Sequence, residues 1–151
     1  MIKESKRKIV MTCGFFNPLH IGHINLFREA KKLGDFLVVI VNNDEQVKLK
    51  GSVHFMSEQE RIEIIKAIKY VGEVFLSIDK DGFQSESLKA VAIKYKDNEL
   101  IFAKGGDRNF DNLPECEKKA CKEYNIKVVN NIGGGKVQSS SWLLRSINDK
   151  K

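Results

Sequence analysis

Residues 12–23 read T-C-G-F-F-N-P-L-H-I-G-H and come directly after the apolar run at residues 9–11. This order predicts a buried strand, a tight turn and the start of a helix. Residues three apart share a helix face, so His20 and His23 are expected to point the same way. The unpaired N–H groups and the dipole at a helix start suit a phosphate, and Gly22 allows the backbone to approach it closely. The stretch therefore predicts a phosphate site after the first strand.

The rest of the chain alternates strand patterns with helical patterns. Further strands are predicted at residues 36–41, 74–76, 100–103 and 126–129. Helices are predicted at residues 21–33, 57–72, 88–95 and 114–124, with a short last helix from Trp142. This alternation indicates an α/β fold with one doubly wound, five-stranded parallel sheet and right-handed crossovers. We expect a single domain over residues 1–151, with its core at residues 8–147.

Polar or glycine-rich segments follow four of the five predicted strands, at residues 12–23, 42–51, 104–108 and 133–141. In doubly wound sheets, ligands bind beyond the carboxyl ends of the strands, where the strand order reverses. We therefore expect these four segments to line one crevice. The turn at residues 79–82, D-K-D-G, lacks the spacing and the terminal Glu of a calcium-binding loop and is expected to be a plain turn.

The charge balance bounds the class of partner. The chain carries 26 Lys and Arg residues against 20 Asp and Glu residues, a net charge of +6. This balance favours anionic partners, and nucleotides satisfy it as well as nucleic acid does. The sequence has no RNA-binding signature and no basic-aromatic platform for a single strand, so nucleic acid is not expected as a partner.

The cysteines and the apolar runs bound the compartment. Cys13, Cys116 and Cys121 lack metal-ligand spacing and are expected to be reduced thiols. The longest apolar run, residues 36–41, is far too short to span a membrane. The basic start runs into the first strand rather than into a long apolar stretch, so no signal peptide is expected. We expect a cytoplasmic protein without membrane contact and without a metal site built from its own side chains.

The segment at residues 14–23, G-F-F-N-P-L-H-I-G-H, resembles the HxGH signature of the cytidylyltransferase-like nucleotidyltransferase superfamily. The resemblance covers residues 8 to about 147. Among the members of this superfamily, the chain most resembles the short bacterial ones, especially glycerol-3-phosphate cytidylyltransferase and the heptose-1-phosphate adenylyltransferase domain. It implies a Rossmann-like nucleotidyltransferase fold. It also implies an enzyme that transfers AMP or CMP from a nucleoside triphosphate to a small phosphate monoester, such as a sugar, polyol or amino-alcohol phosphate, and releases pyrophosphate.

Five further motifs follow in the order that those families show. V-N-N-D at residues 41–44 precedes L-K-G at residues 49–51, and E-Q-E-R at residues 58–61 resembles their E-Q-R or E-H-R helix with one residue extra. K-G-G-D at residues 104–107 resembles the motif after strand four of the heptose enzymes. Q-S-S-S at residues 138–141 resembles their S-T-T phosphate loop.

The resemblance implies a set of site residues. Catalytic, phosphate-handling roles are implied for His20, His23, Lys50 and Arg61. Nucleotide contacts are implied for Gly14, Phe15, Phe16, Asn17, Gly22, Lys48, Gly105, Asp107, Ser139, Ser140 and Ser141. Lys48 is equally compatible with an ordinary solvated lysine, and Arg61 with an ion pair to Glu58 or Glu60. Mg²⁺ is implied as a cofactor that is bound mainly through the triphosphate.

Two positions depart from the pattern of these families. Asn17 stands where most short members have Asp, and Lys136 precedes the serine loop where cytidylyltransferases have Arg. A lysine offers a point charge in place of a bidentate fork. The choice between ATP and CTP stays open, as does the acceptor, whose contacts are expected from residues 80–83 and 108–112. Family precedent implies a homodimer.

Two other functions agree with parts of the sequence. Residues 20–23 spell the H-I-G-H of class I aminoacyl-tRNA synthetases, but the chain has no room for their lysine-rich second loop and tRNA-binding extension. The remaining alternative is a non-catalytic nucleotide-binding or sensor module, which the uncharged Asn17 keeps open. Tight triphosphate binding without pyrophosphate release would distinguish that module from an enzyme.

Overall fold

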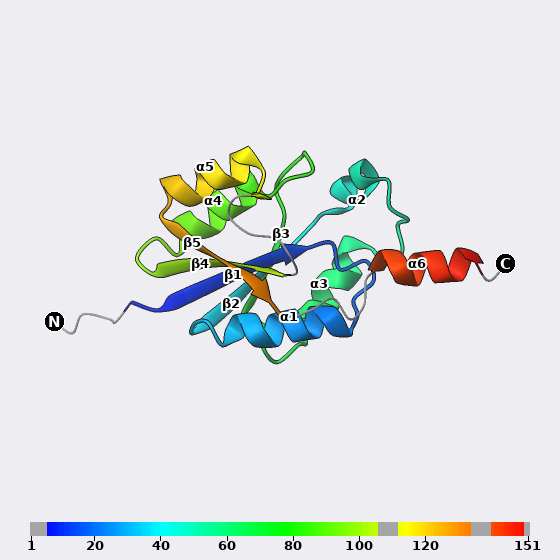
Figure 1. Cartoon of the computed structure of the whole chain (residues 1–151), viewed down its shortest axis with the longest axis horizontal. Helices are drawn as coiled ribbons and strands as arrows, with labels where there is room; N and C mark the ends of the chain where they lie inside the picture. The colour runs from blue at the N-terminus through cyan, green and yellow to red at the C-terminus, as the bar shows by residue number, and fades with distance from the viewer. Residues whose placement is uncertain (1–5, 106–111, 134–139, 150–151) are drawn as a thin grey trace.

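A computed structural model describes residues 6–105, 112–133 and 140–149 of the chain (Figure 1). One sheet is formed by five parallel strands, β1 (Lys8–Gly14), β2 (Phe36–Val41), β3 (Glu73–Leu76), β4 (Glu99–Gly105) and β5 (Ile126–Ile132). The strand order is β3-β2-β1-β4-β5. The predicted doubly wound, Rossmann-like α/β fold is therefore confirmed.

Helices cover both faces of the sheet, with α1 (Ile21–Lys31) and α3 (Glu58–Lys66) on one face and α4 (Ser85–Lys94) and α5 (Glu115–Glu123) on the other (Figure 1). Val10 of β1 packs in the same core as Phe27 of α1. Its neighbours Ile9 and Met11 pack in the opposite core with Leu88 of α4. Both faces of the strand are thus buried, which explains why the strands read as continuous apolar runs.

A short helix, α2 (Asp44–Lys50), lies where the sequence predicted only a loop. Asn43 caps it, because Asn43 Oδ1 accepts from the backbone N–H of Gln46 at 2.9 Å and Gln46 Oε1 accepts from the backbone N–H of Asn43 at 3.0 Å. Gly51 ends it with a φ of 76°, a conformation that glycine adopts without strain. Only Gln46 and Val47 of the helix are buried, so no apolar stripe marks it in the sequence.

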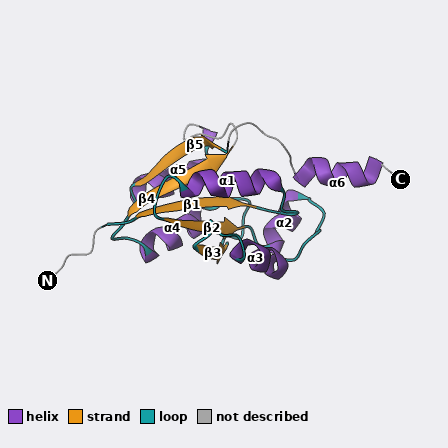
Figure 2. Ribbon diagram, turned by 90° about the horizontal axis from the view of Figure 1, so that it is seen from below, coloured by secondary structure: helices purple, strands orange, loops and turns teal. Residues whose placement is uncertain are grey.

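The strands point to one edge of the sheet, and α1 and α2 begin there after β1 and β2 (Figure 2). The chain runs outward from β1 through β2 to β3 and then crosses back to β4 on the other side of β1. The strand order therefore reverses between β1 and β4, which places the segment after β1 where ligands bind in such folds. Helix α6 (Ser140–Asp149) lies beyond this edge and projects from the body of the molecule (Figures 1 and 2).

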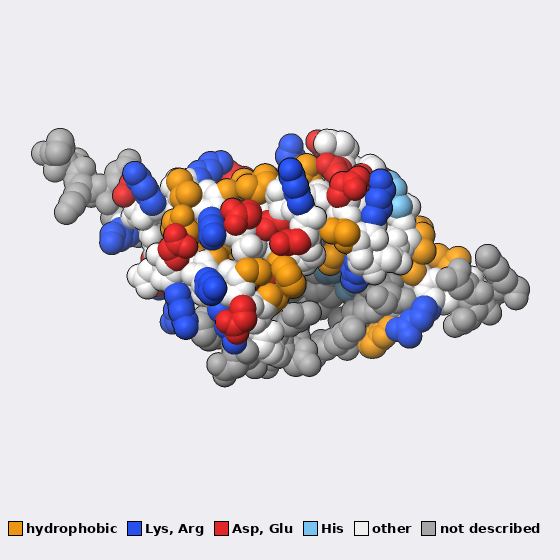
Figure 3. Space-filling view, turned by 90° about the horizontal axis from the view of Figure 1, so that it is seen from above, with side chains coloured by type: hydrophobic (Ala, Val, Ile, Leu, Met, Phe, Trp, Pro, Cys, Tyr) orange, Lys and Arg blue, Asp and Glu red, His pale blue; other side chains and the backbone are white. Residues whose placement is uncertain are grey.

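Charges of both signs share the surface. Figure 3 shows Lys and Arg side chains interleaved with Asp and Glu side chains on one face of the molecule. The net charge of +6 therefore does not gather into a single basic patch on that face. None of the described helices is both long and apolar enough to cross a bilayer.

Candidate active site

His20 and His23 stand together at the start of α1. Their rings are stacked, with centroids 3.8 Å apart and planes at 28°. His20 is the cap residue, and its Nδ1 accepts from the backbone N–H of Gly22 at 3.0 Å. His23 reaches back, and its Nδ1 accepts from the backbone N–H of His20 at 3.2 Å. The predicted common direction of the two imidazoles is therefore what the structure shows.

These hydrogen bonds determine where each neutral ring carries its proton. An imidazole nitrogen that accepts a hydrogen bond holds no proton, so in both rings the proton is on Nε2. Burial, together with the neighbouring His20, lowers the pKa of His23 to about 3. His23 is therefore neutral at physiological pH. It can donate a hydrogen bond from Nε2 but cannot act as a cation.

Phe16 supports the histidine pair from beneath. Its ring is buried and meets the His23 ring edge-on at 4.9 Å between centroids, with Phe27 of α1 at 5.3 Å on another side. Phe16 has a φ of 52°, which is uncommon for a residue with a side chain. A Cβ atom on Gly14 would lie 2.9 Å from the Phe16 ring, so glycine is needed there to make room for it. Gly14 and Phe16, expected to contact nucleotide, thus contribute by packing behind His23.

Arg61 of α3 lies elsewhere than expected. Its side chain is fully buried and donates to four oxygens, namely the carbonyls of Phe15 at 2.7 Å, Asn42 at 2.6 Å and Met56 at 3.1 Å and Asp44 Oδ1 at 2.9 Å. These partners come from the segment after β1, the end of β2, the segment before α3, and α2. The described partners of the Arg61 guanidinium are thus protein oxygens, and its expected phosphate contact stays a prediction. In this structure Arg61 joins four segments around the site, and its ion pair is with Asp44 rather than with Glu58 or Glu60.

Asn17 is also buried and holds the segment before α3. Its Nδ2 donates to the carbonyl of Val53 at 2.7 Å, and its Oδ1 accepts from the backbone N–H of Met56 at 2.8 Å. The peptide bond to Pro18 is cis. A carboxylate could accept from Met56 but could not donate to Val53, which gives a physical reason for Asn where related enzymes have Asp.

Phe15 and Lys50 border a pocket of about 540 Å³. The Lys50 ammonium lies over the Phe15 ring, 4.2 Å from its centroid. The pocket is formed by the segment after β1, by α2 with Leu49, and by residues 80–82 after β3. Three of the four residues expected near the acceptor after β3, residues 80–82, therefore line it. Lys50 lines it too, and its catalytic role stays a prediction.

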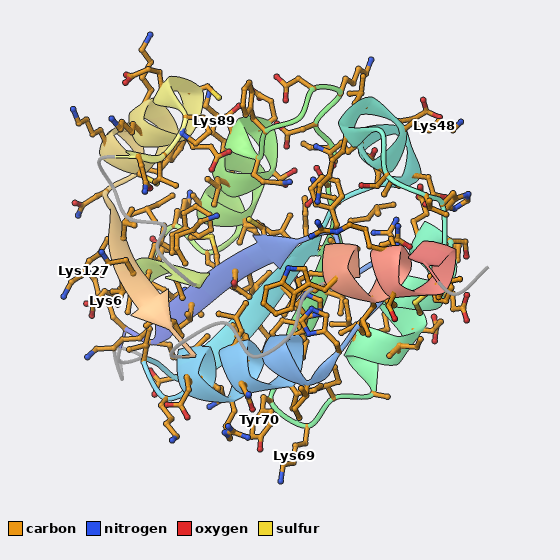
Figure 4. All side chains as sticks on the ribbon, turned by 45° about the vertical axis from the view of Figure 1, so that its right-hand side comes forward. Lys6, Lys48, Lys69, Tyr70, Lys89 and Lys127 are labelled. Carbon is orange, nitrogen blue, oxygen red and sulfur yellow. The ribbon has the colours of Figure 1, made fainter. Side chains whose placement is uncertain are left out.

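Lys48 lies apart from this pocket. Figure 4 shows its side chain projecting outward from α2. Its Nζ forms an ion pair with Glu45 Oε1 at 3.1 Å, and the side chain is 68% exposed. Of the two expectations for Lys48, the structure agrees with an ordinary solvated lysine.

Comparison with known families decides the class of the protein. A family model described as cytidylyltransferase-like matches residues 11–137, which include the whole histidine segment. The chain belongs to the cytidylyltransferase-like family. It is thus a nucleotidyltransferase, as its sequence predicted. Membership of this family explains the H-I-G-H segment at residues 20–23, so the resemblance to an aminoacyl-tRNA synthetase is not needed to explain it.

The nucleotidyltransferase has relatives that match over most of their length. An FAD synthase from Thermococcus sibiricus is 38% identical over 130 residues, 85% of this chain and 82% of that one. An FAD synthase from Thermoplasma acidophilum is 32% identical over 139 residues, 91% and 92% of the two chains. The chain also resembles the crystal structure of the lipopolysaccharide core biosynthesis protein from Thermoplasma volcanium, with a TM-score of 0.63 and 28% sequence identity. The match covers 83% of this chain and 96% of that one. These relatives confirm the superfamily but do not single out glycerol-3-phosphate cytidylyltransferase.

The structure describes some of the remaining predicted contacts of the nucleotidyltransferase and leaves others out. Gly105 ends β4, where a Cβ atom would meet the Ile132 carbonyl and the Leu26 side chain at an ordinary 3.5 Å. Packing within the protein therefore does not by itself require glycine there. Ser140 and Ser141 are the first residues of α6. Asp107 and Ser139 lie outside the described residues, as do Arg108 and Lys136.

Asn43 and Gln46 lie within the predicted crevice segment, residues 42–51, but sequence reasoning assigned neither residue a role of its own. Gln46 is fully buried, and it lines the pocket although its side chain is polar. The pattern N-x-x-Q before an apolar residue is a capping signal, so it could have revealed both the helix and its buried amide. The absence of an apolar stripe outweighed that signal in the prediction.

Proposed function

We propose that this nucleotidyltransferase is an FAD synthase, which transfers AMP from ATP to the phosphate of FMN and releases pyrophosphate. The observation that carries the proposal is the alignment with two proteins of that name over more than four fifths of each chain. The proposal chooses between ATP and CTP and names the acceptor. FMN is a phosphate monoester, so it belongs to the class of acceptor expected from the sequence.

The pocket that Phe15 and Lys50 border supports an acceptor of this kind. FMN combines a planar, largely apolar ring system with a phosphate on a flexible chain. Phe15 and Leu49 offer apolar surface for the rings, while Lys50 and Lys80 offer positive charge for the phosphate. The volume of about 540 Å³ falls in the usual range for small-molecule pockets. We infer that the FMN rings lie there, with the phosphate directed toward His20 and His23.

In the proposed reaction an FMN phosphate oxygen attacks the α-phosphorus of ATP in line. A new P–O bond forms, the bond from the α-phosphorus to the bridging oxygen breaks, and its electron pair leaves with pyrophosphate. The protein contributes position and charge, with no covalent enzyme intermediate. His20 and His23 donate from Nε2 to phosphate oxygens on which charge develops, and the backbone hydrogen bonds to their Nδ1 atoms hold them ready.

Magnesium would neutralise charge on the triphosphate. Within the described residues, no group of three or more His, Cys, Asp or Glu side chains could hold a metal ion. The protein side chains described therefore offer no dedicated cage, and magnesium would be held by phosphate oxygens and water.

The test is a panel of four nucleoside triphosphates against FMN, glycerol 3-phosphate and a sugar 1-phosphate. We expect pyrophosphate release and FAD formation with ATP and FMN. Chromatography and flavin fluorescence detect the FAD. A CDP-conjugate with glycerol 3-phosphate, without FAD, would contradict the proposal. Triphosphate binding without pyrophosphate release from any pair would favour the sensor module instead. The cytoplasmic location stays a prediction. The homodimer implied by family precedent also stays a prediction, and sedimentation of the purified chain would test it.

A further inference from the structure

Two side-chain amides at the start of α2 bind a single segment after β3. Asn43 Nδ2 and Gln46 Nε2 each donate to two backbone carbonyls, those of Ser77 and Asp79 at 3.0 Å and those of Asp81 and Phe83 at 2.9 Å. The four carbonyls belong to every second residue of the segment. The two amides, three residues apart at the start of α2, thus bind alternate carbonyls of one curved segment that contains the bends at residues 80–83. We call these four hydrogen bonds the amide ladder.

The two amides are fully engaged, which gives the ladder one geometry. The Asn43 oxygen accepts from the backbone N–H of Gln46, and the Gln46 oxygen accepts from the backbone N–H of Asn43. An amide carries two N–H donors, and all four donors of the pair point to the segment. Rotating either amide would place N–H against N–H and oxygen against oxygen. Because Gln46 is also fully buried, water cannot replace the partners it would lose.

The same segment is fixed on its other side to α4. The Asp79 carboxylate is buried and accepts from the backbone N–H groups of Glu86 and Ser87, both at 2.9 Å. It also accepts from the Ser87 hydroxyl at 2.5 Å. A carboxylate at a helix start satisfies N–H groups that have no partner within the helix. The segment that contains residues 80–82, which line the pocket, is therefore held by α2 on one side and by α4 on the other.

We propose that Asn43 and Gln46 are positioning residues for the phosphate acceptor. The amide ladder sets the spacing between the two walls of the pocket, α2 with Lys50 and the segment with Lys80. The inference rests on the proposed function, because it takes that pocket to be the acceptor site. The histidine pair is held by other contacts, its own capping hydrogen bonds and Phe16. Loss of the ladder is therefore expected to weaken acceptor binding and to spare the triphosphate.

The chain offers substitutions that remove the donors of the ladder, and of these only Gln46→Met also removes a capping oxygen of α2. Asn43→Asp and Gln46→Glu each keep the oxygen that caps α2 but remove both donors to the segment. Gln46→Met removes the same donors without adding charge, and so separates loss of the ladder from repulsion of an anionic acceptor. Asn98→Asp is the matched control, because Asn98 Oδ1 accepts from the backbone N–H of Arg7 at 3.1 Å, on β1's amino-terminal side.

The readouts are the KM values for FMN and ATP and hydrogen exchange of the segment. We expect Asn43→Asp and Gln46→Met to raise the KM for FMN about tenfold or more, since each loses the two hydrogen bonds that its amide donates to the segment. The KM for ATP and the values for Asn98→Asp are expected to stay within about twofold. Backbone amides of residues 77–84 are expected to exchange faster in both ladder variants. An unchanged KM for FMN in Gln46→Met, or an equal rise in the KM for ATP, would overturn the inference.

Failure of the proposed function gives a different result. In that case the parent chain itself forms no FAD, whatever the variants do. The acceptor that the parent does use in the panel then replaces FMN in the same comparison. A selective rise in its KM supports the positioning role, and equal KM values in parent and variants overturn it.

Discussion

The imidazole of His23 stacks on that of His20 at 3.8 Å between centroids and accepts the backbone N–H of His20 at its Nδ1. Helix capping thus uses the Nδ1 side of both rings, and the proposed ligand chemistry would use the opposite side. The Nδ1 atoms close the first turn of α1, and the Nε2 atoms carry the protons that a phosphate can accept. Substitutions that keep one of these two nitrogen positions and remove the other can test the two roles separately.

Replacing His20 by Asn keeps the capping acceptor and removes the distal donor. We expect Tm to stay close to that of the parent, because Asn caps helices well. The kcat for pyrophosphate release is expected to fall about 10²- to 10³-fold, the usual cost of one lost donor to developing charge. His20→Ala should lose the same activity with an additional small loss of stability. Ser57→Asn, which changes the capping residue of α3, serves as the control. Undiminished turnover in His20→Asn would refute the role of His20 as a hydrogen-bond donor to phosphate.

The lowered pKa of His23 predicts how stability depends on pH. The folded state has a pKa of about 3 against 6.5 for the ordinary imidazole, so between these values only the unfolded state binds the proton. Stability therefore falls as the pH drops through this window, by up to about 1.4 kcal/mol per pH unit. Urea unfolding of the parent and of His23→Gln at several pH values measures the difference. The same slope in both proteins would show that His23 is not buried in its neutral form.

Arg61→Lys tests the four-way contact of the buried guanidinium. A lysine ammonium cannot reach carbonyls of Phe15, Asn42 and Met56 together with Asp44, and it leaves a buried charge with fewer partners. We expect a loss of about 3–5 kcal/mol in the free energy of unfolding. Arg28→Lys, at an exposed ion pair with Glu29, should change it by less than about 1 kcal/mol. Full stability of Arg61→Lys together with weaker triphosphate binding would restore the phosphate-binding role.

Asn17→Asp introduces the residue that most related short enzymes have. Here the carboxylate would lose the bond to the Val53 carbonyl and would sit buried beside that oxygen. We expect the free energy of unfolding to fall by about 1–3 kcal/mol. Thermal unfolding measures it, with Asn25→Asp as control, since Asn25 uses only its oxygen toward Arg28. A more stable or more active Asn17→Asp chain would contradict the assigned role of the amide.

Short-range patterns made much of the molecule predictable. Residues 36–41 are apolar without alternation, which indicates a strand buried on both faces wherever the rest of the chain goes. His20 and His23 share a face because three residues separate them on any helix. The order of strands and helices and the pairing of the histidines depend on such neighbours alone, so both could be inferred before any tertiary contact was known.

Long-range contacts decided what the remaining site residues do. Arg61 and Phe15 are 46 residues apart in the chain, Asn17 and Val53 are 36 apart, and Gln46 and Asp81 are 35 apart. A motif names such a polar residue but does not state which backbone carbonyls come near it once the strands are side by side. The sequence by itself determined the elements and which polar groups gather at the carboxyl edge. Only tertiary structure decided which of them face a ligand and which are buried, because a buried polar group must bind whatever oxygens the assembled sheet brings to it.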